Sequence, residues 1–141
     1  MSRTALLAAG VVLIAAVLSA TVLSTPSSAT PQTMAVTMRH SRFAPAHVVV
    51  RRGATVRFVI TNTDPIDHEF ILGDEAVQRR HETGTEPAHG LVPGEVSVPA
   101  GTVAETTYMF SRAGVVLIGC HALGHYDYGM RGAVLVTPTR I

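Results

Sequence analysis

The sequence predicts an all-β fold, a Greek-key β-sandwich or barrel of seven to eight short strands with one polar excursion. Two observations lead to this prediction. Short runs rich in Val, Ile and Thr recur after residue 32, and turn residues such as Gly, Pro and Asp separate them. Hydrophobic residues alternate over residues 33–39, as expected of a strand that buries one face. A chain of 141 residues is long enough to bury the core of one such domain.

The expected strands follow one another along the chain without any internal repeat. They cover residues 33–39, 47–52, 54–61, 69–72, 95–98, 103–111, 114–119 and 132–137. Arg52-Gly53 and Pro99-Ala100-Gly101 are turn signals between neighbouring runs. This spacing favours a sandwich in which most strands are joined by short loops.

Residues 73–93 form the polar excursion and lack the alternation of a strand. Residues 74–81 are expected to form about two helical turns, because acidic residues stand at the end where the helix dipole favours them. A long excursion in a small sandwich is usually functional or disordered. Its two histidines, His81 and His89, have two interpretations: solvated loop residues, or a weaker secondary metal site.

The first 29 residues are predicted to lie outside the fold. Arg3 precedes an apolar run over residues 5–23, and small residues follow at positions 27–29. This pattern is typical of a secretory signal peptide. Because the run is nearly long enough to span a bilayer, an uncleaved N-terminal anchor is the alternative, and the only membrane contact expected. Residues 30–32 would be a linker and 33–141 the folded domain, exported to the periplasm, the cell exterior or the outer face of the membrane.

The net charge and the cysteine content limit the classes of function that are expected of this protein. The formal net charge is +1 and there is no run of basic residues, so no nucleic-acid partner is expected. Cys120 is the only cysteine, so an exported chain cannot form an internal disulfide. Its thiol must be free, form an intermolecular bridge or bind a metal.

The residues after Cys120 favour a metal. His125 and Met130 follow in the pattern Cys-x4-His-x4-Met, and His68 stands at the expected start of an earlier strand. A thiolate, two imidazoles and a weak axial thioether form the ligand set that suits a single copper ion. His68, Cys120, His125 and Met130 are therefore the candidate copper ligands. Zinc could use the same residues, but methionine is a poor zinc ligand.

These motifs resemble the cupredoxin family, the type 1 blue copper proteins. The resemblance runs from about residue 34 to 138 and includes Gly53-Ala54-Thr55-Val56-Arg57-Phe58. It implies a cupredoxin-like sandwich with one type 1 copper per chain. The implied function is electron transfer by Cu(I)/Cu(II) cycling, with a redox partner protein, by a monomer. The alternative is copper tolerance or delivery, in which some exported bacterial cupredoxins are implicated.

Two positions depart from the family pattern. Many cupredoxins have Asn after the first histidine ligand, where this chain has Glu69. An aromatic residue often precedes the cysteine, where this chain has Gly119. Residues that contact the metal ligands tune the colour and the reduction potential of a copper site, so the sequence does not predict either property. His121 follows the cysteine directly, and its side chain is expected to point away from the metal.

An enzyme is not expected. A multicopper oxidase needs His-x-His pairs, and the sequence has none. A binuclear copper centre needs two cysteines. Cys120 and His121 are adjacent on an extended strand and cannot pair as nucleophile and base.

Overall fold

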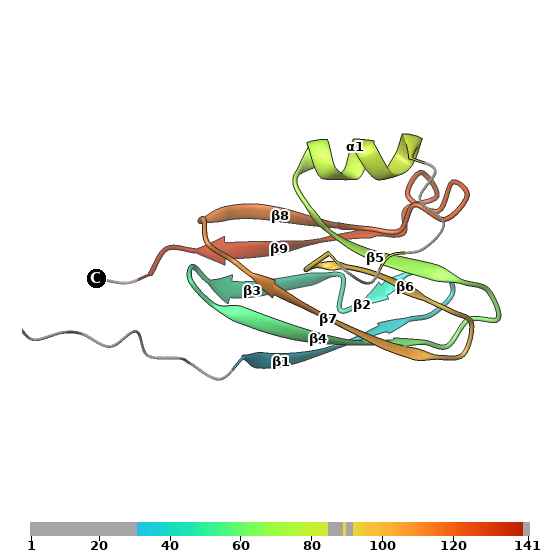
Figure 1. Ribbon diagram of the computed structural model, residues 1–141, viewed down its shortest axis with the longest axis horizontal. Helices are drawn as coiled ribbons and strands as arrows, with labels where there is room; N and C mark the ends of the chain where they lie inside the picture. Colours follow the sequence, from blue (N-terminus) through green and yellow to red (C-terminus); the bar gives the residue numbers. More distant parts are fainter. Residues whose placement is uncertain (1–30, 85–88, 90–91, 140–141) are drawn as a thin grey trace, which may run out of the picture.

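Two β-sheets packed face to face make up the structure, a computed structural model that describes residues 31–84, 89 and 92–139 (Figure 1). One sheet has four strands in the order β2-β1-β4-β7, and the other has five in the order β3-β9-β8-β5-β6. The strands are β1 (Gln32–Met38), β2 (Phe43–Ala44), β3 (His47–Arg51), β4 (Thr55–Asn62), β5 (His68–Gly73), β6 (Glu95–Val98), β7 (Val103–Met109), β8 (Gly114–Gly119) and β9 (Arg131–Thr137), with helix α1 (Glu75–Thr83) after β5.

The strand pairing agrees with the predicted sandwich. β1 runs parallel to β4 and β3 runs parallel to β9, whereas the other pairs are antiparallel. All eight expected strands are present, with ends shifted by up to two residues. Within the described residues there is one further strand, because Phe43–Ala44 pairs with the end of β1. The fold-class prediction is confirmed.

Alternating side chains of β4 show how the core forms. Val56, Phe58 and Ile60 are fully buried, while the residues between them are partly or fully exposed. Phe58 meets Phe70 of the opposite sheet, with ring centroids 5.2 Å apart. Burial of aromatic rings in this way provides much of the hydrophobic stabilisation of a small core.

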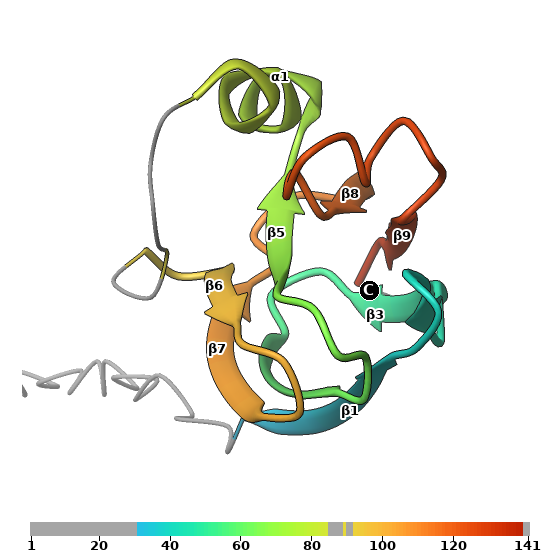
Figure 2. The same cartoon turned by 90° about the vertical axis from the view of Figure 1, so that its right-hand side faces the viewer.

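Helix α1 covers the outer face of the five-stranded sheet, over β5 and β8 (Figure 2). Its N-cap is Asp74, whose side chain accepts a hydrogen bond from the Val77 amide at 2.9 Å. Such a cap satisfies an amide that has no partner within the helix. The predicted helix over 74–81 is therefore present, and it continues to Thr83.

Because α1 lies on this sheet, β5 is buried on both faces. Phe70 and Leu72 belong to the core between the sheets. Ile71 is 0% exposed yet lies outside that core cluster, under α1. Successive side chains of a strand point to opposite faces, so His68 and Glu69 also face opposite sides of the sheet.

No helix in the described residues is long and apolar enough to cross a membrane. The predicted signal peptide or anchor over residues 1–29 lies outside the described residues.

Candidate metal centre

The four predicted ligands come together at one end of the sandwich. His68 begins β5, Cys120 follows β8, and Met130 precedes β9. His125 lies in the loop between β8 and β9. His68, Cys120 and Met130 are each at most 1% exposed, whereas His125 is half-buried.

The three nitrogen and sulfur donors surround a common point. Nδ1 of His68 lies 3.1 Å from Nδ1 of His125. Sγ of Cys120 lies 3.8 Å from the first nitrogen and 3.4 Å from the second. A point in the plane of these atoms is about 2.0 Å from all three, close to ordinary metal–nitrogen and metal–sulfur bond lengths of about 2.0–2.3 Å. The donors are therefore spaced as a trigonal metal site requires.

Backbone hydrogen bonds fix the loop that carries three of the four residues. The Cys120 amide donates to the Met130 carbonyl at 3.2 Å, and the Met130 amide donates to the His125 carbonyl at 2.9 Å. Gly124 and Gly129 have φ values of +78° and +91°, which glycine adopts without steric cost. The loop thus holds its side chains in place through its own backbone.

A buried carboxylate orients His68. Oδ2 of Asp64 accepts a hydrogen bond from Nε2 of His68 at 2.9 Å. The proton on Nε2 leaves the lone pair of Nδ1 facing Cys120 and His125, as in many histidine metal sites. Burial alone would raise the pKa of Asp64, but hydrogen bonds from the backbone of Ser41, His68 and the backbone of His40 together lower it. Sequence reasoning missed this role, although Asp64 stands four residues before His68.

Burial of Cys120 and His125 disfavours the charged forms of their side chains in the absence of a metal cation. Burial raises the pKa of the Cys120 thiol to about 11, although the Glu69 amide donates to its sulfur at 3.3 Å. Burial and the neighbouring His68 lower the pKa of His125. A neutral imidazole offers a lone pair to a metal, and a bound metal would stabilise the thiolate.

Comparisons with known proteins agree with this geometry. A family model described as a cupredoxin-like domain matches residues 11–86. The copper-resistant cuproprotein CopI of Pseudomonas aeruginosa is 31% identical over 128 residues, covering 68% of this chain and 71% of that protein. The chain belongs to the cupredoxin family. CopI of Rubrivivax gelatinosus is 41% identical to this cupredoxin over 98 residues, and the match spans 67% of this chain and 59% of that relative.

Solved structures agree on the fold. Auracyanin B has a TM-score of 0.65 at 24% identity, covering 77% of this chain and 91% of that one. Auracyanin A, titled a blue copper protein of Chloroflexus aurantiacus, has a TM-score of 0.60 at 22% identity, with 77% and 100% covered. In this cupredoxin, copper is the cofactor that the thiolate, imidazole and thioether donors fit.

The two departures from the family pattern have structural roles here. The carboxylate of Glu69 accepts a hydrogen bond from the His121 amide at 3.2 Å, so it braces the residue after Cys120. A Cβ on Gly119 would collide with the Gln78 carboxamide oxygen and the Tyr126 ring. Glycine at this position therefore leaves room for Gln78 of α1 and for Tyr126 of the loop between β8 and β9.

His121 points away from the predicted metal, as expected. Its Nε2 lies 2.8 Å from Oε1 of Gln78 on α1, and its ring stacks on Tyr126 with centroids 4.7 Å apart. Burial, His81 and His89 lower the pKa of His121 to about 4, so this imidazole is neutral near pH 7.

His81 and His89 are not solvated, contrary to one of the two sequence interpretations. Their side chains are only 4% and 5% exposed. The polar composition of the excursion suggested an exposed loop. Instead, the ring of His81 lies 3.3 Å from the carboxylate of Glu95 in β6, and the backbone of His89 bonds to Ser97 of the same strand.

Proposed function

We propose that this cupredoxin holds one copper ion through His68, Cys120, His125 and Met130, and that it contributes to copper tolerance outside the cytoplasm. The observation that carries the ligand assignment is the common point about 2.0 Å from the two Nδ1 atoms and Sγ. When bound, the metal can take up and release one electron, and this mixed donor set accommodates both Cu(I) and Cu(II). All four donors come from one chain, so a monomer suffices.

The similar proteins favour tolerance over a general electron-carrier role. The Rubrivivax and Pseudomonas relatives, and a Vibrio cholerae protein 31% identical over 86 residues, are all named copper-resistant cuproproteins. The buried site would sequester copper from solution, because three of its four donors are at most 1% exposed.

Export is part of the proposal and depends on the N-terminal sequence. An apolar run after Arg3, followed by small residues at 27–29, is typical of a secretory signal. Mass spectrometry of the natively expressed protein should find a chain that starts near Thr30. An intact N-terminus in the membrane fraction would show that the N-terminal segment is retained as an anchor and is not a cleaved signal.

A cysteine–histidine hydrolase fits the same residues less well. Sγ of Cys120 is 3.4 Å from Nδ1 of His125, which is within reach of a nucleophile and its base. However, Cys120 is 0% exposed and its pKa is about 11. Catalytic cysteines are accessible and have lowered pKa values. We therefore assign a binding role rather than catalysis.

The proposal is tested by complementation of a copper-sensitive strain. A strain that lacks the gene should regain growth on copper with the wild type and not with Cys120→Ser. His47→Ala is the matched control, because His47 is an exposed histidine of β3 that is not one of the predicted ligands. Full rescue by Cys120→Ser, with equal protein in the exported fraction, would contradict the role of the site in tolerance.

Electron transfer remains the second candidate function, and the surface around His125 favours it. Leu123 and Tyr128 in the ligand loop are 96% and 77% exposed. Exposed apolar side chains beside a half-buried ligand form a small docking surface for a redox partner protein. Leu123→Glu should leave copper binding unchanged but slow electron exchange with such a partner.

The same variant separates the two functions. If the protein only sequesters copper, Leu123→Glu will restore tolerance as fully as the wild type. If tolerance requires electron transfer to a partner, Leu123→Glu will fail to restore it while its absorption spectrum stays normal.

A further inference from the structure

A second group of metal-binding side chains lies outside the first centre, between α1 and β6. It consists of His81 on α1, His89, and Glu95 at the start of β6, and we call it the His81–His89–Glu95 cluster. One ligand atom from each residue lies within 4.8 Å of the other two. The side chains are 4%, 5% and 7% exposed. Buried ionisable groups require partners or a metal, because burial without one is costly.

The hydrogen bond of His81 fixes which nitrogen faces Glu95. Nδ1 of His81 lies 2.9 Å from the Val77 carbonyl oxygen, which can only accept, so Nδ1 carries the proton. The other nitrogen, Nε2, lies 3.3 Å from Oε2 of Glu95. In the neutral ring this nitrogen is an acceptor, so two acceptors face each other. A proton or a metal cation must lie between them.

His89 lies near the same carboxylate oxygen. Its Nδ1 lies 3.8 Å from Oε2 of Glu95, and its Nε2 lies 3.3 Å from Oε1 of Glu69. The rings of His81 and His89 have centroids 4.8 Å apart. Two protonated imidazoles this close would repel each other in a buried setting. One divalent cation would satisfy His81, His89 and Glu95 together.

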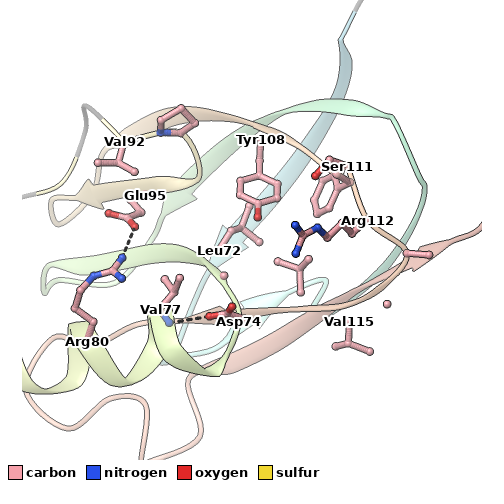
Figure 3. A pocket seen from close by; sticks show the side chains of 16 residues that line it. Leu72, Asp74, Val77, Arg80, Val92, Glu95, Tyr108, Ser111, Arg112 and Val115 are labelled. Carbon is pink, nitrogen blue, oxygen red and sulfur yellow. Dashed lines mark hydrogen bonds and ion pairs between the residues drawn. The ribbon is translucent and has the colours of Figure 1, made fainter.

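Neighbouring residues hold the three side chains in place. Nη2 of Arg80 lies 3.7 Å from Oε1 of Glu95, so the second carboxylate oxygen is left for the cluster. Figure 3 shows Arg80 and Glu95 pointing toward each other beside the groove that Leu72, Val77, Tyr108 and Arg112 also line. The His89 amide donates to Oγ of Ser97 at 2.8 Å, which anchors His89 to β6. The groove reaches Glu95, which is the member of the cluster that lines it.

We propose that His81, His89 and Glu95 bind a second divalent metal ion, copper(II) in preference to zinc(II). Two imidazoles and a carboxylate without sulfur suit a divalent ion rather than Cu(I). Sites with such ligands generally bind copper(II) more tightly than zinc(II). Three protein ligands leave at least one position open to water or another small ligand. This ion would lie on the opposite side of β5 from the first centre and would produce no intense thiolate absorption.

The test is a copper(II) titration of the full-length protein, followed by absorption and electron paramagnetic resonance. The wild type should bind two equivalents, one with the intense thiolate band and one with an ordinary signal that shows nitrogen coupling. His89→Ala and Glu95→Gln should each lose the second equivalent and keep the thiolate band. His47→Ala, which removes an exposed histidine on β3, should keep both equivalents.

The variants separate the failure of this inference from a failure at the first centre. Glu95→Gln preserves the size of the side chain, and an intact thiolate band shows that the protein is folded and the first centre is loaded. A single equivalent in the wild type, or a second equivalent that survives in both variants, would overturn the proposal. Tighter binding of zinc than of copper at this cluster would overturn the choice of metal.

Discussion

Oδ2 of Asp64 and Nε2 of His68 lie 2.9 Å apart, on the edge of the imidazole opposite the donor atom Nδ1. The same carboxylate accepts hydrogen bonds from the His40 and Ser41 amides at 2.6 and 2.8 Å. The carboxylate therefore joins the β1–β2 turn to His68, the first of the predicted ligands. Orientation of His68 depends on a residue that is not itself a ligand.

Asp64→Asn should weaken copper binding at the first centre by about 10–100-fold. The amide keeps the shape of the side chain, but it lacks the charge that stabilises the proton on Nε2 of His68. A competition titration against a chelator measures the affinity. Asp67→Asn is the matched control, because Asp67 accepts from the Ala100 amide in the same loop without contacting His68. Equal affinities in both variants would show that Asp64 does not orient the ligand.

The carboxylate of Asp64 should also make metal-free stability depend on pH. Its folded-state pKa lies below the ordinary value of 3.8, so the folded protein binds this proton more weakly than the unfolded chain does. The resulting stability is fully present above the unfolded pKa and is lost as the pH falls through the folded value. Urea unfolding should therefore show that the gap between wild type and Asp64→Asn narrows from about pH 7 to about pH 3. A gap that stays constant would disprove this contribution.

Cys120→Ser should abolish the intense visible absorption of the copper-loaded protein, because only a thiolate ligand gives that charge transfer. His121→Ala is the control for the neighbouring position and should keep the band, since His121 contacts Gln78 and Tyr126 instead. The absorption spectrum of the oxidised proteins measures both outcomes. A coloured serine variant would mean that Cys120 is not a ligand.

Gly119→Ala should destabilise the protein by about 1–3 kcal/mol, the usual cost of overpacking. The new methyl group would collide with the Gln78 carboxamide and the Tyr126 ring. Thermal unfolding measures the change. The double variant Gly119→Ala, Gln78→Ala should recover part of the loss relative to Gln78→Ala alone, because the first obstacle is removed. An unchanged melting temperature in Gly119→Ala would contradict the packing argument.

The sequence alone predicted the strands that the structure shows, except β2, and it also predicted the four residues of the first centre. A run rich in β-branched residues over 54–61 predicts β4, and Asp74 with the acidic residue after it predicts the start of α1. Cys120, His125 and Met130 could be recognised because they lie in one short loop, where ligand spacing is a property of the sequence. These signals are local, and local chemistry can be read from neighbouring residues.

The tertiary structure alone decided which distant residues meet. Asp64 reaches His68 because Asn62 donates to the Ile66 and Val98 carbonyls and thereby holds the loop that carries Asp64. Glu95 joins His81 and His89 because α1 folds back over the outer face of β5, which hides histidines that a polar sequence suggested were solvated. Burial and the pairing of side chains far apart in the chain depend on packing between elements, and no local pattern in the sequence records them.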